Sequence, residues 1–177
     1  SGRLASSVCA DVETTLMSKE ATKTQPCNYC RRVHLSADKK WQVNSSCMGV
    51  DEIHTESRFI LPVAQEYYYK TKHADYLPLP PFMEGCQGSQ SEPLDFIYPE
   101  HQNTIVLPRG FDGTTERVIF TAVSRKRDAT IYWHLDNDYL GKTQGTHQMS
   151  ALPSLGSHTL SIVDDEGNRK MIIIHVK

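Results

Sequence analysis

Five cysteines in the first half of the chain are the residues best suited to covalent or metal chemistry. In an oxidising compartment they would form disulfides, and their odd number leaves at least one thiol outside any pair. The Cys27-x-x-Cys30 spacing, with His34 and Cys47, also supplies the ligand types of a tetrahedral zinc site, although the second ligand pair is irregularly spaced. Disulfides and zinc both stay open, and no metal is firmly predicted. The candidate residues are Cys9, Cys27, Cys30, Cys47, Cys86 and His34.

A catalytic group is not predicted. The chain has eight histidines, and four of them lie in or beside predicted strands with no nucleophile that converges on them: His134, His147, His158 and His175. A redox-active Cys-x-x-Cys would lie at the start of a helix in a βαβ unit, and that pattern is missing here. The sequence therefore predicts no catalytic residue and no cofactor.

Aromatic rings beside a carboxylate form a second group with binding potential. Many β-sandwich modules hold sugar rings by stacking them on aromatic faces and by hydrogen-bonding their hydroxyls. Trp133 is expected to be the central core residue of its strand rather than part of such a site. The residues predicted to contact a glycan or a protein partner are Tyr132, His134, Asp136 and Tyr139, with Arg125 and Arg127 from a nearby basic run.

The basic run Arg125-Lys126-Arg127 follows a predicted strand, so we expect it to form a loop. Its charges would suit anionic glycan strands or lipid head groups. A solvated turn is the simpler interpretation, and both stay open.

Short β-strands must position these side chains. From Pro93 onward, apolar runs and polar turns recur about every 10 to 15 residues, which is typical of an antiparallel all-β unit. Period-two alternation predicts that Ile131, Trp133 and Leu135 face one way and that Tyr132 and His134 face the other. The predicted runs are DFIYP, NTIVLP, ERVIFTAV, ATIYWHLD, HTLSIVD and RKMIIIHV.

The turns between these runs have suitable residues. Gly167 and Asn168 can take positive φ, and Asn137 lies between two aspartates. Roughly seven strands in about 85 residues predict an immunoglobulin-like antiparallel β-sandwich over residues 91–177. The fold class is therefore mainly β.

Residues 1–90 are predicted to be an irregular Cys/Pro-rich segment with a short helix. Frequent prolines argue against long helices. In the segment FILPVAQEYYYKTKHADY, Pro62 is placed to start a helix, and Val63, Tyr67 and Tyr68 are spaced to share a packed face. The three consecutive tyrosines could also form a sugar platform, but packing is the favoured interpretation.

Charge and hydropathy exclude several classes. The net charge is −2, with ten residues of each sign before Ser91 and nine basic against eleven acidic residues from there on, so neither half predicts nucleic-acid binding. No stretch approaches the roughly 20 apolar residues of a membrane span. The abrupt start at Ser1, without a leader pattern, is expected of a fragment of a longer protein.

Longer motifs carry a resemblance to a known family. The strand ending in WHLD, the following YLG, and the G-x-HTL-x-VD-x-x-G hairpin resemble the C-terminal domain of bacterial penicillin-binding proteins of the 1C type. Upstream, CNYCRRVHL, RFILPVAQEYYYK and YLPLPPF resemble the linker after the transpeptidase domain, and SGRLASSVC resembles the tail of that domain. The resemblance covers nearly the whole chain.

The resemblance implies a cell-wall setting. Members of this family are class A enzymes, bifunctional peptidoglycan glycosyltransferases and transpeptidases, anchored in the inner membrane with their domains in the periplasm. That setting favours disulfides over zinc. The implied partners are the transpeptidase domain of the same polypeptide, and peptidoglycan or another envelope protein.

This chain lacks the family's catalytic motifs. A transpeptidase needs Ser-x-x-Lys, a second serine in Ser-x-Asn, and Lys-Thr-Gly. Only Ser36-Ala-Asp-Lys39 occurs, in a polar segment where chance explains it, and no Glu-Asp pair of the glycosyltransferase type is present. We therefore expect a non-catalytic accessory domain of a penicillin-binding protein. The alternatives are a stand-alone peptidoglycan- or carbohydrate-binding module and, less favoured, a free-standing hydrolase.

Overall fold

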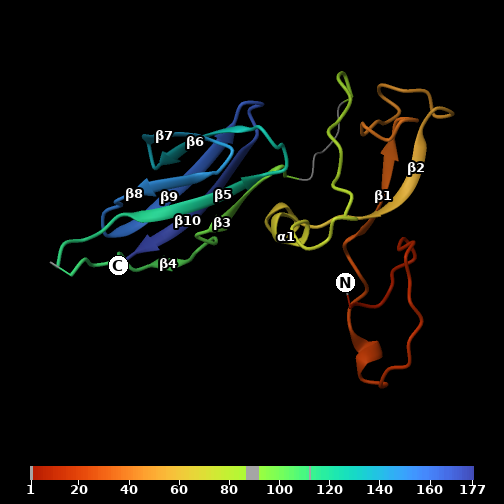
Figure 1. Ribbon diagram of the computed structural model, residues 1–177, viewed down its shortest axis with the longest axis horizontal. Coiled ribbons are helices and arrows are strands. Elements are labelled where there is room, and N and C mark those ends of the chain that lie inside the picture. The colour runs from red at the N-terminus through yellow and green to blue at the C-terminus, as the bar shows by residue number, and fades with distance from the viewer. Residues whose placement is uncertain (1, 87–91, 112) are drawn as a thin grey trace. The chain divides into compact units, whose positions relative to one another are not determined.

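The computed structural model describes residues 2–86, 92–111 and 113–177. The chain divides into two compact units, residues 1–89 and 90–177, and each is described by itself (Figure 1). Within the described residues the fold is mainly β, with one short α-helix in the first unit. The predicted fold class is confirmed.

The first unit is built on a β-hairpin. After a short 3₁₀ turn, η1 (Ala21–Lys23), strands β1 (Cys30–Leu35) and β2 (His54–Phe59) pair antiparallel. Val33 and Leu35 alternate inward and form a small core with Ile60 and Leu79. The sequence predicts no strands here, and that was wrong because polar and charged residues dominate both strands and hide the alternation.

Helix α1 (Val63–Tyr69) begins directly after Pro62, as predicted. Its inward side chains are Val63 and Glu66, and the part-buried Tyr69 ring lies against the rings of neighbouring segments. Tyr67 and Tyr68 are exposed, so the prediction that they share a packed face with Val63 was wrong. The helix turns its i, i+3, i+6 positions inward instead.

A buried polar contact fixes this helix. The Tyr76 hydroxyl donates to Oε2 of Glu66 at 3.1 Å and accepts the Leu61 amide at 3.2 Å. Since a buried carboxylate is costly without hydrogen bonds, the contact explains how a glutamate can lie on the inner side of the helix.

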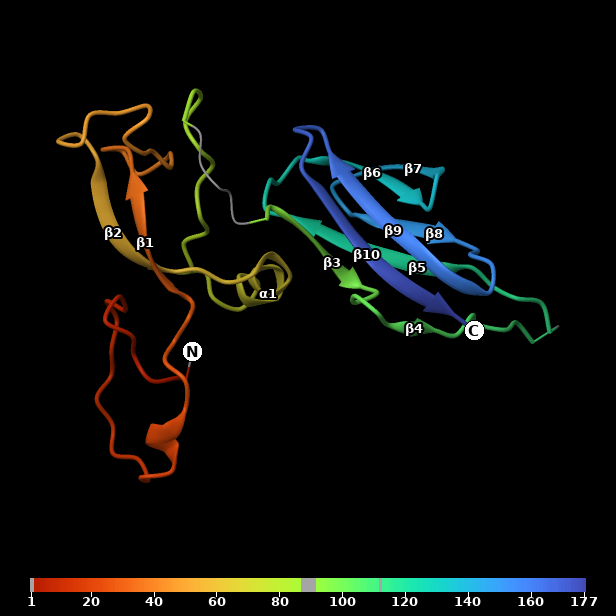
Figure 2. The ribbon, with the colours of Figure 1, turned by 180° about the vertical axis from the view of Figure 1, so that it is seen from behind.

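The second unit is a β-sandwich of two sheets, which Figures 1 and 2 show as stacked layers from opposite sides. One sheet has the strand order β4-β10-β9-β6-β7 and the other the order β3-β5-β8. The strands are β3 (Leu94–Tyr98), β4 (Thr104–Ile105), β5 (Val118–Ser124), β6 (Thr130–Leu135), β7 (Asp138–Gln144), β8 (Gln148–Ala151), β9 (Gly156–Asp164) and β10 (Arg169–Val176).

Two of these strands are absent from the predicted runs. Strands β7 and β8 are mostly polar and exposed, so they carry no clear apolar alternation. In addition, β4 pairs parallel with β10, whereas the sequence predicts a purely antiparallel unit. Gly167 has the expected positive φ, but Asn168 does not. Asn168 instead donates through its amide to Oδ2 of Asp164 at 2.8 Å.

The sandwich core is centred on Trp133, which is fully buried on β6 as predicted. The Phe96 ring of the opposite sheet meets it edge to face, with centroids 6.2 Å apart. Alternation also holds on β5, where Val118, Phe120 and Ala122 are all buried. Because side chains alternate along β6 and Trp133 points into the core, Tyr132 and His134 point to the outer face of the five-stranded sheet.

Two successive hydrogen-bond contacts extend from the buried Trp133 indole. Trp133 Nε1 donates to Thr143 Oγ1 at 2.8 Å, and that hydroxyl lies 3.2 Å from Nδ1 of the buried His147. Because an indole can only donate, the threonine oxygen accepts from it and can donate its own hydrogen to His147. Burial lowers the pKa of His147 and favours the neutral ring that can accept this bond.

We predict that Thr143→Val destabilises the second unit by about 1–3 kcal/mol. Valine keeps the shape of threonine but removes the acceptor of the buried indole N–H, which is then left without that bond. Urea unfolding followed by tryptophan fluorescence measures the change. The matched control is Thr146→Val, at an exposed position three residues away, which should change stability by less than about 0.5 kcal/mol. Equal effects of the two substitutions would contradict the prediction.

Candidate functional site

The outer face of the five-stranded sheet carries three of the predicted contact residues. On β6, Tyr132 and His134 are half-buried and face outward, and on β7 the exposed Tyr139 pairs with His134 across the ladder. The His134 and Tyr139 rings are tilted against each other, with centroids 5.3 Å apart. The structure thus brings this pair together, and Tyr132 lies two residues along β6, opposite Lys142.

Strand pairing extends this pair into a row across the sheet. His134 pairs with Tyr139 on one side and with Ser161 of β9 on the other, and Ser161 pairs with Met171 of β10. We call these four residues the transverse row. Both of its ends, Tyr139 and Met171, are more than half exposed, and Ile173 adds an exposed aliphatic side chain beside it. The row thus has an exposed aromatic end and an exposed apolar end, while Ser161 between them is buried.

The Asp136 carboxylate is held by hydrogen bonds within the fold rather than left open to a ligand. It takes φ +54° in the two-residue turn between β6 and β7, a conformation that aspartate tolerates better than most residues. Its Oδ2 accepts His158 Nδ1 at 2.7 Å and its Oδ1 accepts the Thr159 amide at 2.7 Å. These bonds, the one from His158 first, lower the pKa of the Asp136 carboxyl.

His158 links this turn to the loop between β8 and β9. Its Nε2 lies 2.9 Å from the Ser154 carbonyl oxygen and 3.4 Å from Ser154 Oγ, so a Ser-His-Asp sequence of contacts exists. The carboxylate and the carbonyl can only accept, so the arrangement favours the protonated ring, in which both nitrogens donate. The bond to Asp136 accordingly raises the pKa of His158. A doubly donating imidazolium cannot take a proton from serine, so this is a clamp between two loops and not a general base.

The basic run lies at the other end of β6. Lys126 Nζ donates to Asp165 and Glu166 of the β9–β10 turn, at 3.0 and 2.9 Å. Those bonds, above all the one to Glu166, raise the pKa of the lysine. Because Arg125 and Arg127 precede β6 while Asp136 and Tyr139 follow it, the predicted contact residues do not form one site. The run is a loop as expected, and its lysine is ion-paired.

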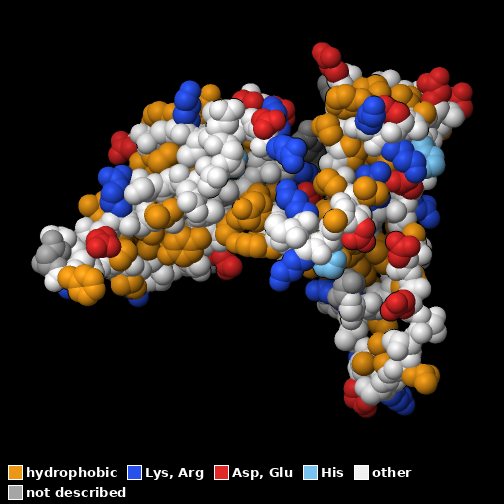
Figure 3. Space-filling model, in the orientation of Figure 1, with side chains coloured by type: hydrophobic (Ala, Val, Ile, Leu, Met, Phe, Trp, Pro, Cys, Tyr) orange, Lys and Arg blue, Asp and Glu red, His pale blue; other side chains and the backbone are white. Residues whose placement is uncertain are grey.

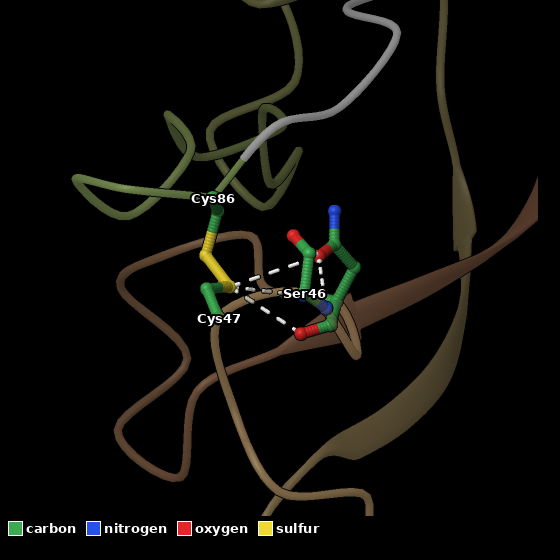
Figure 4. Close-up of a disulfide and its surroundings, with 4 residues drawn as sticks. Ser46, Cys47 and Cys86 are labelled. Carbon is green, nitrogen blue, oxygen red and sulfur yellow. Dashed lines mark hydrogen bonds between the residues drawn. A yellow bond between two sulfur atoms is a disulfide. The ribbon is translucent and has the colours of Figure 1, made fainter.

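The cysteines form two disulfides, Cys9–Cys30 and Cys47–Cys86. Figure 4 shows the second one joining the segment between β1 and β2 to the segment after α1. The buried Cys27 has its sulfur 3.8 Å from that of Cys30, so three sulfurs cluster in the first unit.

The predicted zinc ligands are not brought together. Cys47 is joined to Cys86, and Nδ1 of the exposed His34 lies 2.8 Å from Thr55 Oγ1. Within the described residues, the sulfurs of Cys9, Cys27 and Cys30 are the one group whose ligand atoms cluster closely enough to suit a metal, and two of these sulfurs are bonded to each other. Disulfides therefore replace the four-ligand site that the spacing allowed.

Ser36 and Lys39 do not form a catalytic pair. The Ser36 hydroxyl donates to the Asp38 carboxylate, and Lys39 donates to Glu56 at 2.7 Å. The segment is a turn after β1, with Lys39 at positive φ, and not the helix that would place a lysine one turn after a serine. The Ser-x-x-Lys spacing is thus a coincidence of sequence.

Comparison with known proteins places the chain in a family. Residues 83–174, about half of the chain, match the Penicillin-Binding Protein C-terminus Family. The chain belongs to this family. Among solved structures, it is similar to the fibronectin(III)-like modules of CbhA from Clostridium thermocellum, with 16% sequence identity, a TM-score of 0.37, and coverage of 48% of this chain and 95% of that one. No curated protein matches it.

As a member of the Penicillin-Binding Protein C-terminus Family, the chain contains a non-catalytic C-terminal module of bifunctional penicillin-binding proteins. The family implies the cell envelope. The described residues include no helix long and apolar enough to cross a membrane. The family resemblance inferred from the WHLD and HTL motifs is confirmed.

Sequence reasoning missed several residues of this module's outer face. Met171 and Ile173 alternate with the buried Ile172 and Ile174, so the run RKMIIIHV carried the signal for an exposed apolar edge. The contact between His158 and Asp136 had no such signal. It joins residues 22 positions apart through strand pairing, which spacing alone does not reveal.

We predict a pH optimum of stability that depends on the Asp136–His158 pair. A raised folded-state pKa means that the His158 contribution is complete below its unfolded value of 6.5 and is lost as pH rises through the folded pKa. The lowered pKa of Asp136 makes its contribution complete above 3.8 and lost as pH falls. Both contributions are complete between these two values.

Asp136→Asn tests this pair because asparagine keeps the turn and the acceptor for Thr159 but removes the charge. The Asp136→Asn substitution should lower the free energy of unfolding by up to about 1 kcal/mol near pH 5. It should also reduce the loss of stability that the wild type shows above about pH 6.5. Thermal unfolding from pH 4 to 9 measures both effects. Asp138→Asn, at an exposed position of the same hairpin, is the control and should keep the wild-type pH profile. An unchanged profile in Asp136→Asn would contradict the assignment.

We predict that the double substitution Cys47→Ser and Cys86→Ser destabilises the first unit by about 3–4 kcal/mol. The bridge spans 39 positions, and opening a loop of that length returns chain entropy to the unfolded state. Limited proteolysis, with cut sites mapped by mass spectrometry, should show faster cleavage within residues 2–86 and unchanged cleavage within residues 113–177. Equal resistance of the wild type and the double variant to cleavage within residues 2–86 would contradict the prediction.

Proposed function

We propose that this chain is an accessory part of a class A penicillin-binding protein of the 1C type, acting in cell-wall biogenesis. In this proposal the module helps to position the transpeptidase domain of the same polypeptide and contacts glycan or another envelope protein. The whole protein would be periplasmic and anchored in the inner membrane. Membership of the Penicillin-Binding Protein C-terminus Family is the observation that carries this proposal.

The outer face of the five-stranded sheet supports a glycan contact. Tyr139 offers an exposed ring, tilted against the His134 ring, and aromatic faces bind the C–H faces of sugars. Exposed hydroxyls on the neighbouring β9, including those of Ser157 and Thr159, supply hydrogen-bonding groups on the same side of the sheet. An exposed sheet face of this kind suits a long polymer, because a polymer can contact several such modules weakly at once.

A second candidate is a peptidoglycan- or carbohydrate-binding module whose sugar affinity is its main activity. The exposed Tyr139 favours this candidate too. The two candidates differ in what binds most tightly. An accessory module should bind the separately purified transpeptidase domain more tightly than glycan, and a binding module should show the reverse.

We predict that Tyr139→Ala lowers binding of the chain to purified peptidoglycan sacculi several-fold. Removing the ring removes a stacking contact worth about 1 kcal/mol, which is roughly a fivefold change in affinity. Sedimentation of the chain with sacculi measures the bound fraction, and Tyr132→Ala should have a smaller effect because that ring is only half exposed.

The matched control is Tyr98→Ala, which removes a similarly exposed ring from β3 of the other sheet. It should leave the bound fraction unchanged. Absence of binding to sacculi, or equal losses for Tyr98→Ala and Tyr139→Ala, would count against the glycan contact. Binding to the transpeptidase domain is measured in a separate experiment. A negative result with sacculi therefore does not decide the result for the transpeptidase domain.

A further inference from the structure

A groove opens at the end of the sandwich where β4 and β10 finish. Two stretches of chain form its walls, residues 106–109 after β4 and residues 152–155 between β8 and β9, and the groove has a volume of about 750 Å³. That size is within the range of ligand sites in proteins. None of its lining residues belongs to the transverse row.

The walls of this groove are largely aliphatic. Val106 and Leu155 are each more than 70% exposed and Leu152 is 53% exposed, and Leu107 and Pro153 line the same groove. In Figure 3, hydrophobic side chains lie on the surface at the part of this unit where Figure 1 marks the C-terminus. Several large aliphatic side chains around one concavity are unusual on a solvent-facing surface and mark interaction sites.

The charged side chains that line the groove are both cations, Arg109 and Lys177. No ion pair engages either of them within residues 92–111 and 113–177. The remaining polar lining consists of the hydroxyls of Thr115 and Ser154. The chemistry of the groove is therefore apolar walls with positive charge and hydroxyl donors.

One wall is held in place before any ligand binds. Ser154 accepts through its carbonyl from His158, which is fixed in turn by Asp136. Pro153 is buried and its ring fixes the backbone φ. A wall anchored at two neighbouring residues loses little freedom on binding, which favours affinity.

We propose that this groove binds an extended segment of another cell-envelope protein that carries aliphatic side chains and carboxylates. The aliphatic side chains would enter between residues 106–107 and 152–155, and the carboxylates would pair with Arg109 and Lys177. A lipid surface fits less well, because insertion into a bilayer needs apolar side chains on a projecting surface, whereas these side chains line a concavity. The groove is independent of the glycan contact proposed above.

Selection of peptides tests this proposal. A library of random ten-residue peptides is selected on the intact chain and on the charge-reversed variant Arg109→Glu with Lys177→Glu. The wild type should enrich peptides that combine aspartate or glutamate with leucine, isoleucine or valine. The charge-reversed variant should lose those peptides at least tenfold and enrich basic ones. Arg169→Glu is the matched control, since Arg169 begins the strand that Lys177 follows, and it should enrich the wild-type set.

Titration calorimetry with the most enriched peptide then locates the site. Leu152→Asn with Leu155→Asn should weaken binding at least tenfold. Ile119→Asn, which replaces an exposed aliphatic side chain on β5, and Tyr139→Ala should leave it unchanged. No enriched peptides, no acidic bias among them, or equal binding by the charge-reversed variant would overturn the proposal. Tight binding to vesicles of phosphatidylglycerol, with no binding of the peptide, would overturn it in favour of a membrane.

Discussion

Burial of the Trp133 indole is the constraint on which the second unit depends. The ring fills the space between the sheets against Phe96, and its N–H donates to Thr143 of β7. That bond supports the register in which Thr143 pairs with Ile131 and Gly141 with Trp133. The register shifts by one residue between Trp133 and His134, and beyond this shift Tyr139 pairs with His134 on the outer face.

The first unit is stabilised differently, because it has little apolar surface to bury. Its core consists of Val33, Leu35 and Ile60 with Leu79, far fewer side chains than the sandwich core contains. Two disulfides offset this, since cross-links limit the freedom of the unfolded chain where burial contributes little. The two disulfides thus compensate for the small apolar core of this unit.

The outer surfaces of the sandwich are organised by contacts between loops. The clamp from Asp136 through His158 to Ser154 joins the β6–β7 turn, which carries Tyr139 close behind it, to the wall of the aliphatic groove. Lys126 makes an analogous connection at the other end, to the β9–β10 turn. Each end of the sandwich therefore has a charged contact that joins two loops.

The sequence by itself determined the mainly β class, the helix start at Pro62, the burial of Trp133 and the inward parity of β5 and β6, because each depends on local periodicity or backbone chemistry. Only the tertiary structure decided the polar strands β7 and β8, the disulfide pairing, and the separation of Arg125 and Arg127 from Tyr139. Those features depend on pairing between residues distant in sequence. A cysteine or a polar edge strand carries no local mark of its partner, so the spacing alone left both zinc and the disulfide pairing open.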